Sequence, residues 1–156
     1  MDAFVALPRL SPLLVVRDVA RAVDFYAQAF DAQVLARFVH APTGALVHVD
    51  LALGDASFAV TTEARAWNAD APESLGGSPV VLQLRVADVG ACFARACDAG
   101  ASVVFPLVEF AGERMARVRD PSGHLWILSQ VLEELSPEEK QRRRDAFRER
   151  SSRDRA

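Results

Sequence analysis

Two polar side chains on one predicted strand are of types, and at a spacing, that could do chemistry. His48 and Asp50 lie two positions apart in the segment Ala45–Leu53, whose β-branched and aliphatic residues predict a strand. Because side chains alternate across a strand, this pair shares one face and its aliphatic neighbours take the other, core-facing side. An imidazole beside a carboxylate could hydrogen-bond a ligand or act as a general base. The alternatives are an ordinary exposed strand face or a pair that stabilises a dimer.

Other residues could complete a ligand-binding site. Arg117 lies on the predicted strand Met115–Arg119 and could contact an anionic ligand, although a solvated strand residue is the simpler interpretation. Phe38 and Phe58 are candidates for apolar walls. His124 and Trp126 share one face at the start of the last predicted strand. His124 could instead stabilise a turn, and Trp126 could belong to the core.

Common catalytic motifs are absent from the sequence. It contains no nucleophile motif, phosphate-binding loop or dinucleotide fingerprint. Cys92 and Cys97 lie five residues apart in one predicted helix, which places them on different faces and makes a disulfide between them unfavourable. We therefore expect two free thiols, as is usual in a cytoplasmic protein.

Composition narrows the classes of partner. A chain of 156 residues with 51% hydrophobic and 25% charged residues is typical of one globular domain. A formal net charge of −3 argues against nucleic acid as the main partner. The sequence has no apolar run of the roughly 20 residues that a membrane span needs. Its start, Met1-Asp2-Ala3-Phe4, lacks the features of a secretion signal, so we expect a cytoplasmic protein without a membrane partner.

The same pattern of elements occurs twice along the chain. A short apolar strand, an aspartate suited to capping a helix, an amphipathic helix and three strands occupy residues of about 10–62, called module 1. The order repeats at about 80–131, called module 2, with Asp18 and Asp88 offset by 70 residues. Residues 63–79, rich in Pro, Gly and Ser towards their end, form a hinge. The pattern predicts an α+β fold of two tandem βαβββ modules; two unrelated α+β halves are the alternative.

A charged helix is predicted at residues 136–150. Ser136, Pro137 and Glu139 form a strong helix start with a capping box. Phe147 is one of few apolar residues in the remainder, so we expect this helix to be solvated or to pack on a partner through Phe147.

The motifs together resemble a known family. The sequence is similar to the vicinal oxygen chelate superfamily of glyoxalases, bleomycin-resistance proteins and extradiol dioxygenases, and in particular to its PhnB-like branch. The resemblance covers about residues 10–145 and rests on the order of several stretches. These are Ser11–Asp18, Ala22–Tyr26, His48–Leu51, Gly54-Asp55, Val86–Val89, Ala99–Ala101, Gly112–Arg114, Arg119–Trp126 and Leu135–Glu139.

The resemblance implies a cupped mixed sheet, a cleft lined by strands of both modules, and a homodimer. It also implies a divalent metal held by one residue from the first and last strand of each module, which map to Ser11, Ala59, Val81 and Ile127. Three of these side chains are hydrocarbon, so we expect no inherited metal site and no cofactor. A relocated site built from His48, Asp50, His124 or Glu113 remains an alternative.

These observations predict a metal-free protein that binds a small, partly aromatic molecule in the cleft and sequesters it, as bleomycin-resistance proteins do. The binding residues would be Phe38, His48, Asp50, Phe58, Arg117, His124 and Trp126. One alternative is a glyoxalase-like lyase or isomerase with a rearranged metal site. Another is a cofactor-free enzyme of secondary metabolism that uses His48 as base and Asp50 to orient it.

Overall fold

The structure is a computed structural model that describes residue 8 and residues 10–153, with side chains described up to residue 148. The N-terminal residues used above to exclude a secretion signal lie outside the described part. Within that part, no helix has both the length and the apolar character needed to cross a membrane.

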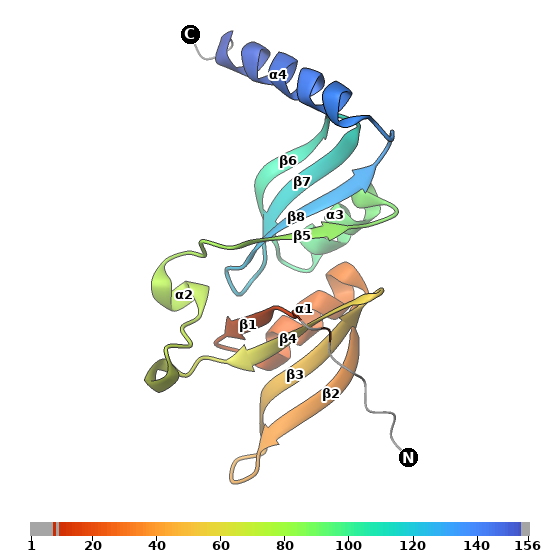
Figure 1. Cartoon of the computed structure of the whole chain (residues 1–156). Coiled ribbons are helices and arrows are strands. Elements are labelled where there is room, and N and C mark those ends of the chain that lie inside the picture. Colours follow the sequence, from red (N-terminus) through yellow and green to blue (C-terminus); the bar gives the residue numbers. More distant parts are fainter. Residues whose placement is uncertain (1–7, 9, 154–156) are drawn as a thin grey trace.

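Module 1 forms one four-stranded sheet with a helix. In chain order it contains β1 (Leu13–Val16), α1 (Val19–Phe30), β2 (Gln33–His40), β3 (Ala45–Leu53) and β4 (Ala56–Thr62). The strand order is β1-β4-β3-β2; β1 runs parallel to β4 and the other pairs are antiparallel. A 3₁₀ turn (Arg65–Trp67) and the short helix α2 (Pro72–Leu75) lead to the second module (Figure 1).

Module 2 repeats this topology. It contains β5 (Val81–Arg85), α3 (Val89–Asp98), β6 (Ser102–Phe110), β7 (Glu113–Arg119) and β8 (Leu125–Val131), with strand order β5-β8-β7-β6. Leu13 pairs with Ala59 in the first sheet and Gln83 with Ile127 in the second, at equivalent places in the two topologies. The predicted α+β fold of two βαβββ units is therefore confirmed.

Helices α1 and α3 each begin directly after the aspartate that the sequence predicts as the N-cap. The side chain of Asp18 accepts a hydrogen bond from the backbone N–H of Arg21, and Asp88 accepts one from Ala91, both at 3.0 Å. Such a cap satisfies an N–H group that has no partner within the helix. The two caps fix the same strand-to-helix turn in both modules.

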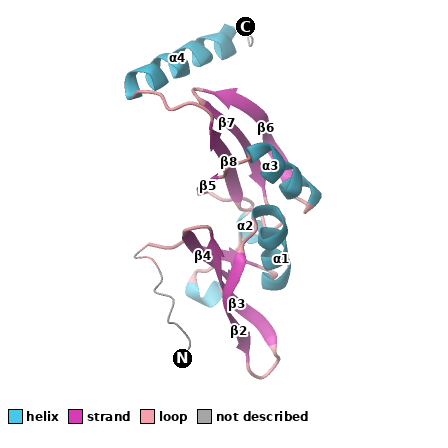
Figure 2. Ribbon diagram, turned by 90° about the vertical axis from the view of Figure 1, so that its right-hand side faces the viewer, coloured by secondary structure: helices cyan, strands magenta, loops and turns pink. Residues whose placement is uncertain are grey.

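The core lies between the helices and one face of each sheet. Helices α1 and α3 pack against each other on the same side of the two sheets (Figure 2). The core is shared by both modules, since Phe30 of α1 lies 4.9 Å, between ring centroids, from Trp126 of β8. The predicted inward face of β3 is confirmed at Val49 and Leu51, which are fully buried.

A buried carboxylate joins the two modules. Asp120, only 3% exposed, accepts hydrogen bonds from the Tyr26 hydroxyl at 2.6 Å and from Trp126 Nε1 at 2.9 Å. The backbone N–H groups of Ser122 and His124 also donate to it, at 2.9 and 3.0 Å. We call these five residues the Asp120 cluster. Four donors compensate the cost of burying the carboxylate, so the turn before β8 is tied to α1.

Tyr26 offers a direct test of this arrangement, because it is the one tyrosine in the sequence. Burial, and then the charge of Asp120, raise the pKa of Tyr26 well above its usual value of 10.0. The folded state therefore keeps a proton that the unfolded state loses, so stability falls as pH rises above about 10. We expect no tyrosinate absorbance at 295 nm until the protein unfolds at alkaline pH. A smooth titration near pH 10 in folded protein would contradict the burial of this hydroxyl.

The C-terminal helix α4 (Pro137–Arg153) begins at the predicted proline and extends past residue 150. It lies at the end of module 2, beyond the ends of β6 and β7, and contacts β6 (Figure 1). Phe147 packs edge-on against Phe110 of β6, with 4.7 Å between ring centroids. Phe147 therefore packs on its own chain. The sequence predicts a helix that is either solvated or packed on a partner, so neither alternative describes this contact.

Candidate functional site

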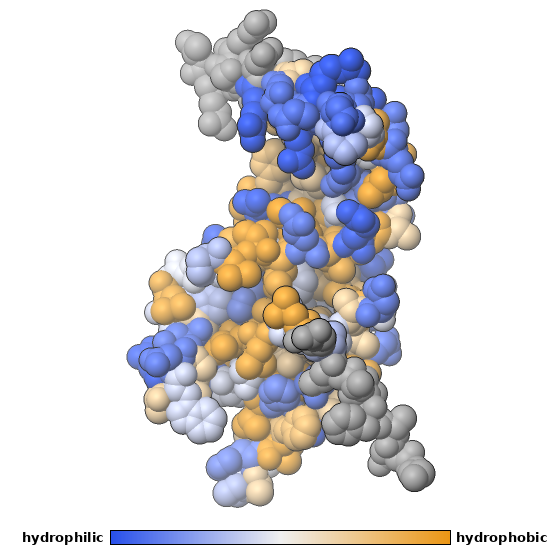
Figure 3. Space-filling view, in the orientation of Figure 1, coloured by the Kyte–Doolittle hydropathy of each residue, from blue (hydrophilic) through white to orange (hydrophobic). Residues whose placement is uncertain are grey.

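Each sheet leaves one face open. Both helices cover the same side, so the opposite faces of the two sheets are turned away from the core (Figure 2). In the inner strands β3, β4, β7 and β8, side chains on those faces are partly exposed, whereas most of their neighbours along the strands are buried. Figure 3 shows apolar residues across much of this side of the molecule and strongly polar residues over α4. Side chains on these open faces are accessible to a ligand, and a separate cavity of about 320 Å³ lies between β1, β5 and the hinge.

A cavity of about 420 Å³ occupies the open face of module 2. We call it the module-2 cavity. Its volume falls within the roughly 300–1,000 Å³ typical of small-molecule sites. It is lined by residues of three strands and α4: Val104, Phe105, Val108, Phe110, Met115, Ala116, Arg117, Ile127 and Phe147. The lining is apolar apart from one cation.

That cation is Arg117, at the centre of β7. It is flanked in the sheet by Phe105 of β6 and Ile127 of β8. Among the described residues, no carboxylate lies within salt-bridge distance of its guanidinium. The sequence-predicted role of Arg117 as an anion contact is therefore compatible with its position.

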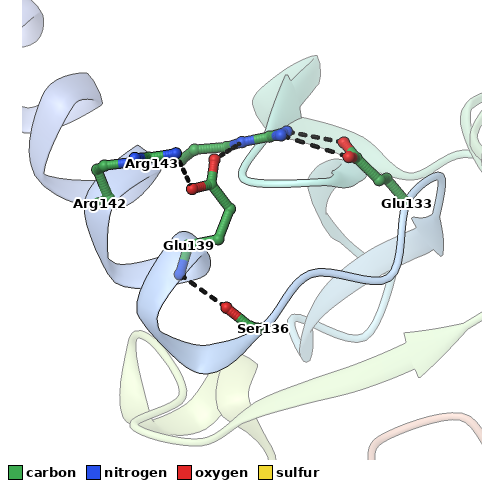
Figure 4. Close-up of polar contacts among 5 residues, drawn as sticks. All are labelled: Glu133, Ser136, Glu139, Arg142 and Arg143. Atoms are coloured by element: carbon green, nitrogen blue, oxygen red, sulfur yellow. Dashed lines mark hydrogen bonds and ion pairs between the residues drawn. The ribbon is translucent and has the colours of Figure 1, made fainter.

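Helix α4 is held over the rim of the cavity by ionic contacts. Lys140 donates to Glu113 of β7 at 2.9 Å. Arg143 bonds Glu133 in the preceding loop at 2.8 Å and Glu139 one turn earlier at 2.7 Å, and Arg142 also pairs with Glu139 (Figure 4). The N-cap predicted at Ser136 is present, at 3.2 Å from the backbone N–H of Glu139. These contacts hold Phe147 against the cavity.

The His48–Asp50 pair occupies the open face of module 1. Its two side chains point to the same side of β3, as predicted, and His48 Nε2 lies 3.0 Å from Asp50 Oδ1. The Phe38 ring of the neighbouring strand packs edge-on against the imidazole, at 5.5 Å between ring centroids. Both polar side chains are partly exposed, so a ligand or another protein chain can reach them. They do not line the module-2 cavity.

Two predicted ligand-binding residues lie in the core instead, and a third lines a different cavity. Phe58 and Trp126 are 6% and 4% exposed and pack against each other and against Tyr26. His124 is also buried, and its Nε2 donates to the carbonyl of Val15 at 2.9 Å. The shared face of His124 and Trp126 is thus the core-facing one, since it continues into fully buried Leu128. None of the three lines the module-2 cavity, and His124 lines the smaller cavity between β1, β5 and the hinge.

The positions mapped for a metal do not supply a ligand set. Ala59, Val81 and Ile127 present only hydrocarbon, and the Ser11 hydroxyl donates to the carbonyl of Ser57 at 3.1 Å. Divalent metals need oxygen, nitrogen or sulfur donors. Among the described residues, no three His, Cys, Asp or Glu side chains lie close enough together to hold a metal ion. The residues present therefore do not fit the family's metal centre.

The cysteines are free, as predicted, and are poor nucleophiles. Cys92 is buried on α3, and its thiol lies 3.6 Å from the carbonyl oxygen of Ala29. Burial raises the pKa of Cys92, and the pKa of Cys97 is raised for the same reason. A protonated thiol is a weak nucleophile, so neither cysteine is placed in the site.

Several cavity residues were missed by the sequence analysis. They are Phe105, Phe110 and Met115, together with Phe147 as part of the wall. Register shifts flank Phe105 in β6, between Val103 and Phe105 and again before Val108, and they change which side chains share a face. Simple alternation fails along such a strand. The proline at position 106 was the available signal, because proline inside a strand marks an edge or a bulge.

Comparisons with known proteins agree with this fold. An uncharacterized protein of Mycobacterium tuberculosis (strain ATCC 25618 / H37Rv) is 43% identical over 136 residues, which cover 85% of this chain and 79% of that protein. The crystal structure of TioX from Micromonospora sp. ML1 has a TM-score of 0.61 and 28% identity, covering 83% of this chain and 100% of TioX.

A more distant structure shares the fold alone. FosX, a fosfomycin resistance protein from Listeria monocytogenes crystallised with Mn(II), has a TM-score of 0.62 at 15% identity, covering 88% of this chain and 98% of FosX. The family model described as "Glyoxalase/Bleomycin resistance protein/Dioxygenase superfamily" matches residues 7–128. The chain therefore belongs to the glyoxalase/bleomycin resistance protein/dioxygenase superfamily.

Proposed function

We propose that this protein binds a small, partly aromatic molecule without a metal and sequesters it, in the manner of a bleomycin-resistance protein. The observation that carries the proposal is the module-2 cavity, which combines an apolar, aromatic lining with a single cation. The sequence predicts a ligand in a cleft lined by both modules, whereas this cavity is lined by module 2 and α4 alone. Hydrocarbon at the mapped metal positions supports binding rather than metal-assisted chemistry. We also propose that the protein belongs to the PhnB-like branch. We expect it to act in the cytoplasm, where binding would keep an antibiotic from its target.

We further propose that the protein acts as a homodimer. The outer strands β2 and β6 carry exposed apolar side chains, including Val34 and Phe38 on the first and Val103 and Phe105 on the second. Large exposed apolar areas are typical of surfaces that another chain covers.

Calorimetric titration tests the binding function. Tryptophan quenching is poorly suited, because neither tryptophan lines the module-2 cavity. Trp126 is in the core and Trp67 is exposed in the hinge. A panel of aromatic natural products and antibiotics should be titrated into protein kept in EDTA. We expect saturable binding at micromolar concentrations, unchanged when Mn²⁺, Ni²⁺ or Zn²⁺ replaces the chelator. Binding that requires one of these metals would contradict the proposal, as would no binding across the panel.

A cofactor-free enzyme is the second candidate, and the His48–Asp50 contact favours it. A carboxylate that accepts from one imidazole nitrogen leaves the other nitrogen free to take a proton from a bound molecule. Conversion of a bound compound by wild-type protein in EDTA, lost in His48→Ala with binding kept, would support this role. Equal conversion by the two proteins would exclude His48 as the base.

A further inference from the structure

The module-2 cavity has a chemical preference that its lining defines. Phe105, Phe110 and Phe147 supply three aromatic rings, and Met115 adds a polarisable side chain. Such side chains favour flat aromatic ligands, which offer a large contact area to rings and to sulfur. The cavity is therefore suited to a planar ring system rather than to a sugar or a flexible polar chain.

Charge adds a second requirement. Glu113, on the same strand, is paired with Lys140, whereas Arg117 lines the cavity without a carboxylate partner among the described residues. A guanidinium beside an apolar surface binds a carboxylate, sulfonate or phosphate strongly, because its donors match two acceptor oxygens at once. The local charge of the cavity thus favours an anion.

The third feature is the contribution of α4. Phe147 lines the cavity and contacts Phe110, and the Arg144 guanidinium lies 5.7 Å from the centroid of the Phe110 ring. The wall next to Phe110 is thus supplied by a helix outside the two modules. A ligand in the cavity would contact α4 as well as the sheet.

We propose that the module-2 cavity selects planar aromatic anions, with Arg117 as the partner of the anionic group and Phe147 of α4 as a wall that contributes to affinity for any aromatic ligand. This inference rests on the proposed binding function and adds the ligand class and the part played by α4. Arg117 would determine the preference for charge. Phe147 would strengthen binding without affecting that preference.

Two matched probes separate these roles. 8-Anilinonaphthalene-1-sulfonate is an aromatic anion built on a planar naphthalene ring, and N-phenyl-1-naphthylamine has the same rings without the sulfonate. Both fluoresce in apolar surroundings, and both should be titrated into full-length protein in EDTA. We expect wild-type protein to bind both at saturable sites and to prefer the anion.

The variants should affect the two probes differently. Arg117→Met should weaken binding of the sulfonate about tenfold and leave the neutral probe nearly unchanged, because only a charge-assisted hydrogen bond is lost. Arg119→Met, on the same strand but outside the cavity lining, is the matched control and should change neither. Arg117→Lys keeps the charge and should retain most of the preference, which separates charge from packing.

Phe147→Ala should weaken binding of both probes about three- to tenfold with an unchanged ratio between them, as expected for a lost aromatic contact. Gln141→Ala on the same helix is its control. The inference is overturned if Arg117→Met affects both probes equally or neither, or if Arg119→Met has the same effect. It is also overturned if Phe147→Ala affects neither probe. If wild-type protein binds neither probe saturably, the proposed binding function itself fails.

Discussion

Replacing Asp120 by alanine is expected to lower the free energy of unfolding by about 3–5 kcal/mol. The substitution leaves the Tyr26 hydroxyl, Trp126 Nε1 and two backbone N–H groups of the turn buried without their acceptor. Each unsatisfied buried group costs about 1–3 kcal/mol, reduced where water or a neighbour can replace the carboxylate. Urea unfolding followed by circular dichroism measures the change.

Asp24→Ala is the control for this substitution. Asp24 lies exposed on α1, so its loss should change the free energy of unfolding by no more than about 0.5 kcal/mol. Asp120→Asn should lie between the two, since an amide can still accept from some of these donors. If Asp120→Ala were as stable as the control, the carboxylate would not join α1 to the turn before β8.

Trp126→Ala is expected to cost a similar amount, about 3–5 kcal/mol. The indole is 4% exposed and packs between the rings of Phe30, Tyr26 and Phe58, so its removal leaves a cavity in the core that both modules share. It also removes one donor to Asp120. Denaturant unfolding measures the loss.

Trp67→Ala provides the comparison, because Trp67 is 86% exposed and its loss should leave stability within about 0.5 kcal/mol of wild type. The neutral probe N-phenyl-1-naphthylamine should bind Trp126→Ala and wild-type protein with the same affinity at a temperature where both are folded. Loss of binding in folded Trp126→Ala would restore this tryptophan to the ligand site, against its position in the core.

The fold could be predicted because its determinants are local. Helices α1 and α3 begin at the capping residues Asp18 and Asp88, and the apolar stripes that follow them mark the buried faces. The repeat was visible for the same reason, since each module carries the same succession of strand, cap and helix. Helix α4 was predicted from its N-terminal signature, but nothing local to it indicated that Phe147 would meet Phe110.

The site was harder to predict because it depends on which face of each strand is open. For β3 the alternation is regular, so the shared face of His48 and Asp50 could be predicted, although not the contact between them. For β8 the alternation was equally clear, but only the tertiary packing shows that the face of Trp126 is the buried one. In β6 the register shifts around Phe105 disrupt the alternation, so the four cavity residues of this strand could not be derived from the sequence.

The central claim is that a ligand binds in the module-2 cavity without a metal. Its most direct test is an NMR titration of ¹⁵N-labelled protein with 8-anilinonaphthalene-1-sulfonate in EDTA. We predict the largest amide shifts along β6 and β7 near Phe105 and Arg117, with smaller shifts around Phe147 in α4. Largest shifts instead along β1 and the hinge near Pro79, or shifts that appear only after a divalent metal is added, would contradict the claim.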